Sequence, residues 1–136
     1  MPSTIKFSLL SRIESVDESA AKADAFAREA GLTDEHIFAI DLAIRESVAN
    51  AVKHGNKLDE TKPVEVELTI GDGTLEISVR DYGSGFSPEE LPDPTDAENL
   101  LKADGRGILF MRTFMDRVEW SHPPGGGTVT KMEKDL

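Results

Sequence analysis

The sequence contains no cysteine, which excludes disulfide bonds, thiolate metal sites and a cysteine nucleophile. It also lacks any apolar run long enough to span a membrane. Its first twenty residues, MPSTIKFSLLSRIESVDESA, contain no continuous apolar region and no small-residue cleavage site of a secretory signal. We therefore expect a cytoplasmic protein with no membrane segment.

Positive charge is scarce, because 15 lysines and arginines face 26 aspartates and glutamates, for a formal net charge of -11. Binding to nucleic-acid phosphates requires clustered Lys and Arg, so direct contact with DNA or RNA is not expected. A basic protein partner fits this charge better. The length of 136 residues and the 38% hydrophobic content suit one folded domain over residues 1–136.

Hydrophobic periodicity predicts strands and helices in partly separate groups. The predicted strands cover 4–10, 64–70, 75–81, 117–120 and 128–132, and the predicted helices cover 15–31, 33–55 and 105–116. Ser15 and Glu18 predict a capping box for the first helix, and Gly55 predicts a C-terminal cap for the second. Residues 82–104, rich in Gly, Pro and acidic residues, predict a long irregular lid. Hairpins without regular βαβ units indicate an α+β sandwich.

The segment ESVANAVKHGN places Glu46, Asn50 and His54 four residues apart, on one face of the second helix. This pattern fits either a solvated polar stripe or the wall of a site. The amide oxygen of Asn50 suits a magnesium ion, and Glu46 could act as a general base. His54 could contact phosphate, but we favour a simple interaction with the helix C-terminus. Lys53 is interpreted as a solvated or phosphate-steering charge.

Asp81 ends the third predicted strand on the same side as its apolar residues. A buried carboxylate is costly unless donors surround it, so an isolated Asp at this position would be expected to turn outward. Gly83 and Gly85 follow, and glycines permit close approach of a flat ligand. A glycine pair separated by one residue also marks ordinary turns, so this pattern alone leaves both interpretations open.

A second glycine pair, Gly105 and Gly107, opens the third predicted helix. The free N–H groups at a helix N-terminus favour anions such as phosphate. Arg106, between them, could place its guanidinium on a terminal phosphate, although an exposed loop arginine is the simpler interpretation.

Four segments taken in order, ESVANAVKHGN, DYGSGF, GRGILFMRTFMD and GGGT, resemble the N, G1, G2 and G3 boxes of the GHKL ATPase superfamily. The resemblance runs from about Asp41 to Met132. Within the superfamily, the sequence is most similar to bacterial anti-sigma factor serine/threonine-protein kinases. This resemblance implies a Bergerat fold: a two-layer α/β sandwich with a mixed, mostly antiparallel sheet packed on helices, and an ATP lid.

The resemblance also implies roles for individual residues. Glu46 would be the catalytic base, Asn50 the Mg²⁺ ligand and Asp81 the acceptor of a hydrogen bond from the adenine amino group. The remaining nucleotide-binding positions implied are Lys53, His54, Gly83, Gly85, Gly105, Arg106, Gly107, Ile108 and Thr128. The second box is a short GRG, and the lid sequence PDPTDAENLLKADG carries no strong motif. The phosphate contacts are therefore supported by fewer matching residues than the roles of Asn50 and Asp81.

By this resemblance the chain would use ATP and Mg²⁺ as an ATP-dependent protein serine/threonine kinase. It would bind a sigma factor of RNA polymerase, phosphorylate a STAS-domain anti-sigma-factor antagonist and form a homodimer. Two alternatives are a non-catalytic binding module controlled by ATP and a detached ATPase domain of the histidine-kinase type.

Overall fold

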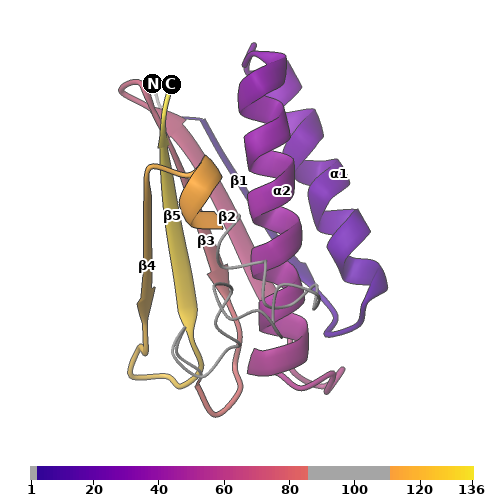
Figure 1. The fold of residues 1–136 in the computed structure, drawn as a ribbon. Helices are drawn as coiled ribbons and strands as arrows, with labels where there is room; N and C mark the ends of the chain where they lie inside the picture. The colour runs from indigo at the N-terminus through magenta and orange to yellow at the C-terminus, as the bar shows by residue number, and fades with distance from the viewer. Residues whose placement is uncertain (1–2, 86–110) are drawn as a thin grey trace, which may run out of the picture.

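The protein folds as a five-stranded antiparallel sheet with two long helices on one face (Figure 1). The computed structural model describes residues 3–85 and 111–136. The elements are β1 (Ser3–Leu9), α1 (Glu14–Glu29), α2 (Asp34–Asn50), the π-helical turn η1 (Ala51–Gly55), β2 (Val64–Gly71), β3 (Thr74–Arg80), β4 (Arg117–Ser121) and β5 (Val129–Asp135). The strand order is β1-β2-β3-β5-β4. The predicted α+β sandwich is therefore confirmed, with every described strand pairing antiparallel.

The core lies between the sheet and the helices, because each central strand alternates apolar and polar residues. In the register of β2 and β3, Val66 lies opposite Val79 and Leu68 opposite Ile77, and all four side chains are buried. Helix α2 contributes Ile40, Ile44 and Val48 to the same core. Each such side chain stabilises the fold by about 1.5–3 kcal/mol on burial. The sheet thereby holds the end of β3 against the end of α2.

The two helices begin differently from each other. Thr33 caps α2 as predicted, because its hydroxyl accepts a hydrogen bond from the backbone N–H of His36 at 3.1 Å. The predicted capping box in α1 is wrong. Helix α1 already begins at Glu14, and the Ser15 hydroxyl instead donates to the carbonyl oxygen of Leu10 at 2.6 Å. Ser15 is buried, so its hydroxyl requires this partner in the preceding turn.

The predicted glycine cap at the end of the second helix is also wrong. After Asn50 the helix widens into η1, where the N–H of Asn56 donates to the carbonyl of Ala51 at 2.8 Å. The backbone stays right-handed at Asn56 (φ −84°) and turns left-handed only at Lys57 and Leu58. Gly55 is therefore required for space and not for a left-handed cap, as its neighbours show below.

Residues 111–114 are helical and lead into β4. Met111 and Met115 are buried in the core, and the carboxylate of Asp116 accepts a hydrogen bond from the backbone N–H of Asp135 at 2.7 Å. This agrees with the end of the helix predicted over 105–116. The rest of that helix, and the lid predicted over 82–104 from residue 86 onward, lie outside the described residues.

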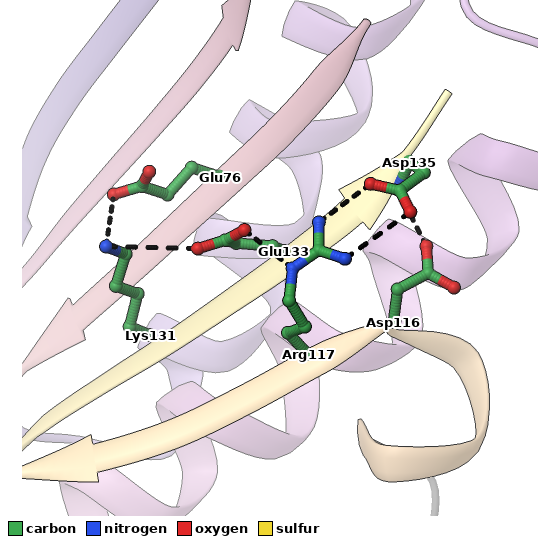
Figure 2. Close-up of polar contacts among 6 residues, drawn as sticks. All are labelled: Glu76, Asp116, Arg117, Lys131, Glu133 and Asp135. Carbon is green, nitrogen blue, oxygen red and sulfur yellow. Dashed lines mark hydrogen bonds and ion pairs between the residues drawn. The ribbon is translucent and has the colours of Figure 1, made fainter.

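The face of the sheet opposite the helices carries a network of charged side chains (Figure 2). Arg117 on β4 binds Glu133 and Asp135 on β5, at 2.8 and 2.7 Å. Lys131 lies 3.5 Å from Glu76 and 3.9 Å from Glu133, which joins β3 to β5. These cross-strand pairs fix the register of the edge strand, although partly exposed pairs stabilise a fold only slightly. Among the described residues, no helix is both long and apolar enough to cross a membrane.

Candidate functional site

Asp81 lies directly after β3 and is 1% exposed, so it does not turn outward as an isolated aspartate at a strand end would be expected to do. Its Oδ1 accepts hydrogen bonds from the backbone N–H groups of Gly83 at 3.0 Å and Thr128 at 3.3 Å. Burial raises the pKa of Asp81, and the two amide donors oppose that rise. The carboxylate is thus a strong acceptor in a poorly solvated place, held by donors on one of its oxygens.

Glycines make this packing possible. A Cβ at Gly55 would lie 2.3 Å from Oδ2 of Asp81, and a Cβ at Gly83 would lie 1.8 Å from the carbonyl oxygen of Gly55. A Cβ at Gly127, whose φ is +82°, would lie 1.9 Å from the carbonyl oxygen of Asp81. No side chain fits at any of the three positions. The end of η1, the residues after β3 and the turn before β5 therefore pack closely here, with Gly83 and Gly127 each against a backbone carbonyl and Gly55 against the Asp81 side chain.

Helix α2 supplies the second wall of the site. Glu46 is half-buried, and one turn later Asn50 is 3% exposed. The amide nitrogen of Asn50 is buried and has no hydrogen-bond partner among the described residues. A buried NH2 group without an acceptor is costly, so the amide nitrogen is suited to donate a hydrogen bond to a ligand, and the amide oxygen is the atom that could bind a metal ion.

The turn η1 carries two further predicted residues. Lys53 is exposed, whereas His54 is half-buried, and its Nε2 is buried without a partner among the described residues. Such π-helical turns occur frequently at functional sites. Gly55 ends the turn beside Asp81, so the structure brings η1 and the β3 end together as the sequence interpretation requires.

Thr128 contacts Asp81 through its backbone. Besides its N–H bond to the carboxylate, its carbonyl accepts the N–H of Asp81 at 3.0 Å. The Thr128 hydroxyl lies 3.5 Å from Nδ1 of His122. Gly85, with φ +91°, also lies close to that imidazole: a Cβ there would stand 3.2 Å from the same nitrogen. The predicted residues Gly105, Arg106, Gly107 and Ile108 lie outside the described residues.

Sequence reasoning missed two residues at this site, His122 and Asn56. His122 lies next to Thr128, and nothing in the sequence around it distinguishes it from an ordinary loop histidine. Asn56 is 2% exposed and hydrogen-bonds to the backbone N–H of Tyr82. Its position directly after Gly55 is the only signal available, and periodicity cannot identify a buried amide in a loop.

The donor set fits an adenine nucleotide with a magnesium ion. A buried carboxylate flanked by glycines can accept a hydrogen bond from the amino group of a flat base. The amide oxygen of Asn50 is a hard ligand of the kind that magnesium prefers. No group of three or more His, Cys, Asp or Glu side chains in residues 3–85 and 111–136 could hold a metal ion. Magnesium bound through phosphates and water needs only one or two protein oxygens.

Comparisons with known proteins agree with this geometry. The model of the histidine kinase-like ATPase domain matches residues 9–134. An anti-sigma F factor of Clostridium perfringens is 30% identical over 138 residues, which cover 100% of this chain and 99% of the relative. An anti-sigma F factor of Heyndrickxia coagulans is 32% identical, covering 97% and 90% of the two chains. A serine-protein kinase RsbW of Listeria monocytogenes is 27% identical, covering 95% and 86%.

A solved structure also matches the fold. The structure of the RsbU and RsbW domains of a Mycobacterium tuberculosis protein superposes with a TM-score of 0.73 at 22% identity. The match covers 98% of this chain and 32% of that longer chain. At this identity the likeness shows the fold alone, and it confirms the architecture that the four sequence boxes implied.

Proposed function

Because the chain belongs to the histidine kinase-like ATPase family, and within it to the anti-sigma factor kinases, we propose that it is an ATP-dependent protein serine/threonine kinase. It binds a sigma factor of RNA polymerase and phosphorylates a STAS-domain anti-sigma-factor antagonist. The single observation that carries this proposal is the buried carboxylate of Asp81, which lies between glycines at the end of β3.

Asp81 recognises the base. Its carboxylate accepts a hydrogen bond from the adenine amino group, because the surrounding amide donors already orient it. Gly83 and Gly85 leave room for the base and sugar, and Thr128, directly before β5, supports the same pocket. A base without an amino group at this position would leave the second oxygen of the buried carboxylate without that donor, which disfavours such a base.

Asn50 and Glu46 act at the phosphate end. The amide oxygen of Asn50 is the protein ligand for Mg²⁺, and the ion when bound neutralises phosphate charge during phosphoryl transfer. Glu46, one turn earlier on α2, accepts the proton of the substrate hydroxyl. By the family resemblance, Lys53 and His54 would also contribute to nucleotide binding, as would Gly105, Arg106, Gly107 and Ile108, which lie outside the described residues.

The partners follow from the relatives. Those relatives are named anti-sigma F factor and serine-protein kinase RsbW, which supports a sigma factor and its antagonist as partners of this chain. The net charge of -11 suits a partner with a basic surface. We place this activity in the cytoplasm, where sigma factors act, and in a homodimer as the family resemblance implies.

The test of this function is phosphoryl transfer from Mg-ATP to the cognate STAS-domain protein. Glu46→Gln should abolish transfer while sparing ATP affinity, because it removes the base and keeps the shape of the side chain. Glu35→Gln, the same change at an exposed position in the first turn of α2, is the matched control and should leave transfer unchanged.

Full transfer by Glu46→Gln would show that Glu46 is not the base. Tight ATP binding by the wild type without any transfer would favour the alternative, a binding module in which ATP controls partner affinity.

A further inference from the structure

Asn56 joins three segments of the chain that are far apart in the sequence. It is the first residue after η1 and is 2% exposed. Its Nδ2 donates to Ser11 Oγ at 2.8 Å and to the carbonyl oxygens of Pro63 and Lys62 at 3.0 and 3.2 Å. Its Oδ1 accepts the backbone N–H of Tyr82 at 2.8 Å. A buried amide with both ends engaged this way has one orientation.

The acceptor end acts on Asp81. Because a peptide group is planar, a hydrogen bond to the N–H of Tyr82 fixes the whole peptide that joins Asp81 to Tyr82. The peptide before Asp81 is fixed separately, since its N–H donates to the carbonyl of Thr128 at 3.0 Å. Asp81 is therefore clamped on both sides, although it lies beyond the last residue of β3.

The donor end provides a rigid base for that clamp. Ser11 follows β1, and Lys62 and Pro63 precede β2, so the amide of Asn56 is anchored at the ends of two paired strands. The Ser11 hydroxyl also donates to the carbonyl of Lys62. The side chain of Tyr82 has its own partners, Glu65 and Arg80, and these hold the ring without orienting the peptide.

We propose that Asn56 is a positioning residue for nucleobase selection, acting through the Tyr82 amide to hold the Asp81 carboxylate in its accepting orientation. The inference rests on the function proposed above, because it assumes that Asp81 receives the adenine amino group. Asn56 itself does not touch the base. Its loss should therefore weaken discrimination between bases more than it weakens the binding of the shared triphosphate.

The experiment compares the dissociation constants of ATP and inosine triphosphate, which carries a carbonyl where adenine has its amino group. In Asn56→Ala the preference for ATP, measured as the dissociation constant of inosine triphosphate divided by that of ATP, should fall about tenfold or more. This is the loss expected for a misaligned hydrogen bond to a charged group. Asn56→Ser replaces the alanine variant if that variant does not fold. Its hydroxyl is too short to span the same partners, so the preference for ATP should fall by the same factor.

Ser11→Ala is the matched control. It removes a partner at the donor end and leaves the Oδ1 bond to Tyr82 in place, so the melting temperature should fall while the nucleotide ratio stays at the wild-type value. If Asn56 merely stabilised the fold, Asn56→Ala would behave like Ser11→Ala, with a lower melting temperature and an unchanged nucleotide ratio. The ratio thus separates positioning from stability.

Amide hydrogen exchange in the absence of nucleotide supplies a second measurement. The Tyr82 amide should be protected in the wild type and should exchange about tenfold faster or more in Asn56→Ala. An unprotected Tyr82 amide in the wild type, or an unchanged ratio in a folded Asn56 variant, would overturn the positioning role alone. Wild-type protein that binds neither nucleotide would overturn the proposed function and this inference with it.

Discussion

Gly83→Ala is the sharpest test of the way the site is packed. The φ of Gly83 is not in the left-handed region, so an alanine would be allowed there on backbone grounds. Its Cβ, however, would stand 1.8 Å from the carbonyl oxygen of Gly55 and 2.5 Å from the carbonyl carbon. Since such contacts essentially never fall under 3.0 Å, the two segments must separate by more than an ångström.

The size of the effect follows from the hydrogen bonds at this contact. The separation breaks the Tyr82 N–H bond to Asn56, which joins the two segments, and distorts the turn in which the Gly83 N–H donates to the carboxylate of Asp81. Together these bonds contribute about 2–4 kcal/mol to the free energy of unfolding. For a domain of this length the loss lowers the melting temperature by about 10 °C. Adenine nucleotide binding should weaken as well, because Asp81 loses its alignment.

Chemical denaturation and calorimetric nucleotide binding measure both effects. Gly31→Ala is the control, since Gly31 has φ +80° and nothing within 4 Å of an added Cβ. It should cost about 1 kcal/mol through backbone strain alone, with no change in binding. Gly83→Ala stability within about 0.5 kcal/mol of wild type, together with unchanged binding, would refute the backbone-to-backbone packing of this site.

Three further predictions concern charged groups. Asp81→Asn should reduce ATP affinity by about tenfold or more without lowering the stability of the free protein, because burial already disfavours the ionised carboxylate; a large loss of stability would contradict this. Burial, and then the hydrogen bond and charge of Asp41, raise the pKa of Asp24 to about 6 from 3.8, so the folded state binds this proton more tightly than the unfolded chain. Ionised Asp24 therefore lowers stability above pH 6, and Asp24→Asn should raise the urea midpoint at pH 8, with the gain shrinking as the pH falls below 6; an equal gain at pH 8 and pH 4 would refute it. Arg117→Ala should lower the urea midpoint only slightly, and the loss should shrink in high salt, because its ion pairs with Glu133 and Asp135 are exposed to solvent; a salt-independent loss would show that the contacts are mainly packing.

Local pattern was sufficient for most of the fold. Strands β2 and β3 alternate so regularly that their buried faces were predictable, and Thr33 marks the start of α2 because its hydroxyl satisfies a free N–H in the first turn. The two capping errors arose where a residue had two possible uses. Ser15 could have capped a helix or bonded to the turn before it, and only the burial of that turn decided between them.

Gly55 shows the same limit at the site. A glycine after an apolar helix usually marks a left-handed cap, and here it is needed because Asp81 and Gly83 pack against it. Those neighbours come from β3, and their distance from Gly55 depends on the pairing of the whole sheet. No window of sequence around Gly55 contains that information.

The order of the elements, the family and the strand parity that places Asp81 on the apolar side could all be read from the sequence, because they depend on local periodicity and on short motifs. The way that the end of η1, the residues after β3 and the turn before β5 meet depends on the folded arrangement. That arrangement requires three glycines for space and makes Asn56 the link between Ser11, Pro63 and Tyr82. Such contacts join residues distant along the chain. They exist only after the sheet has paired and the helices have packed on it.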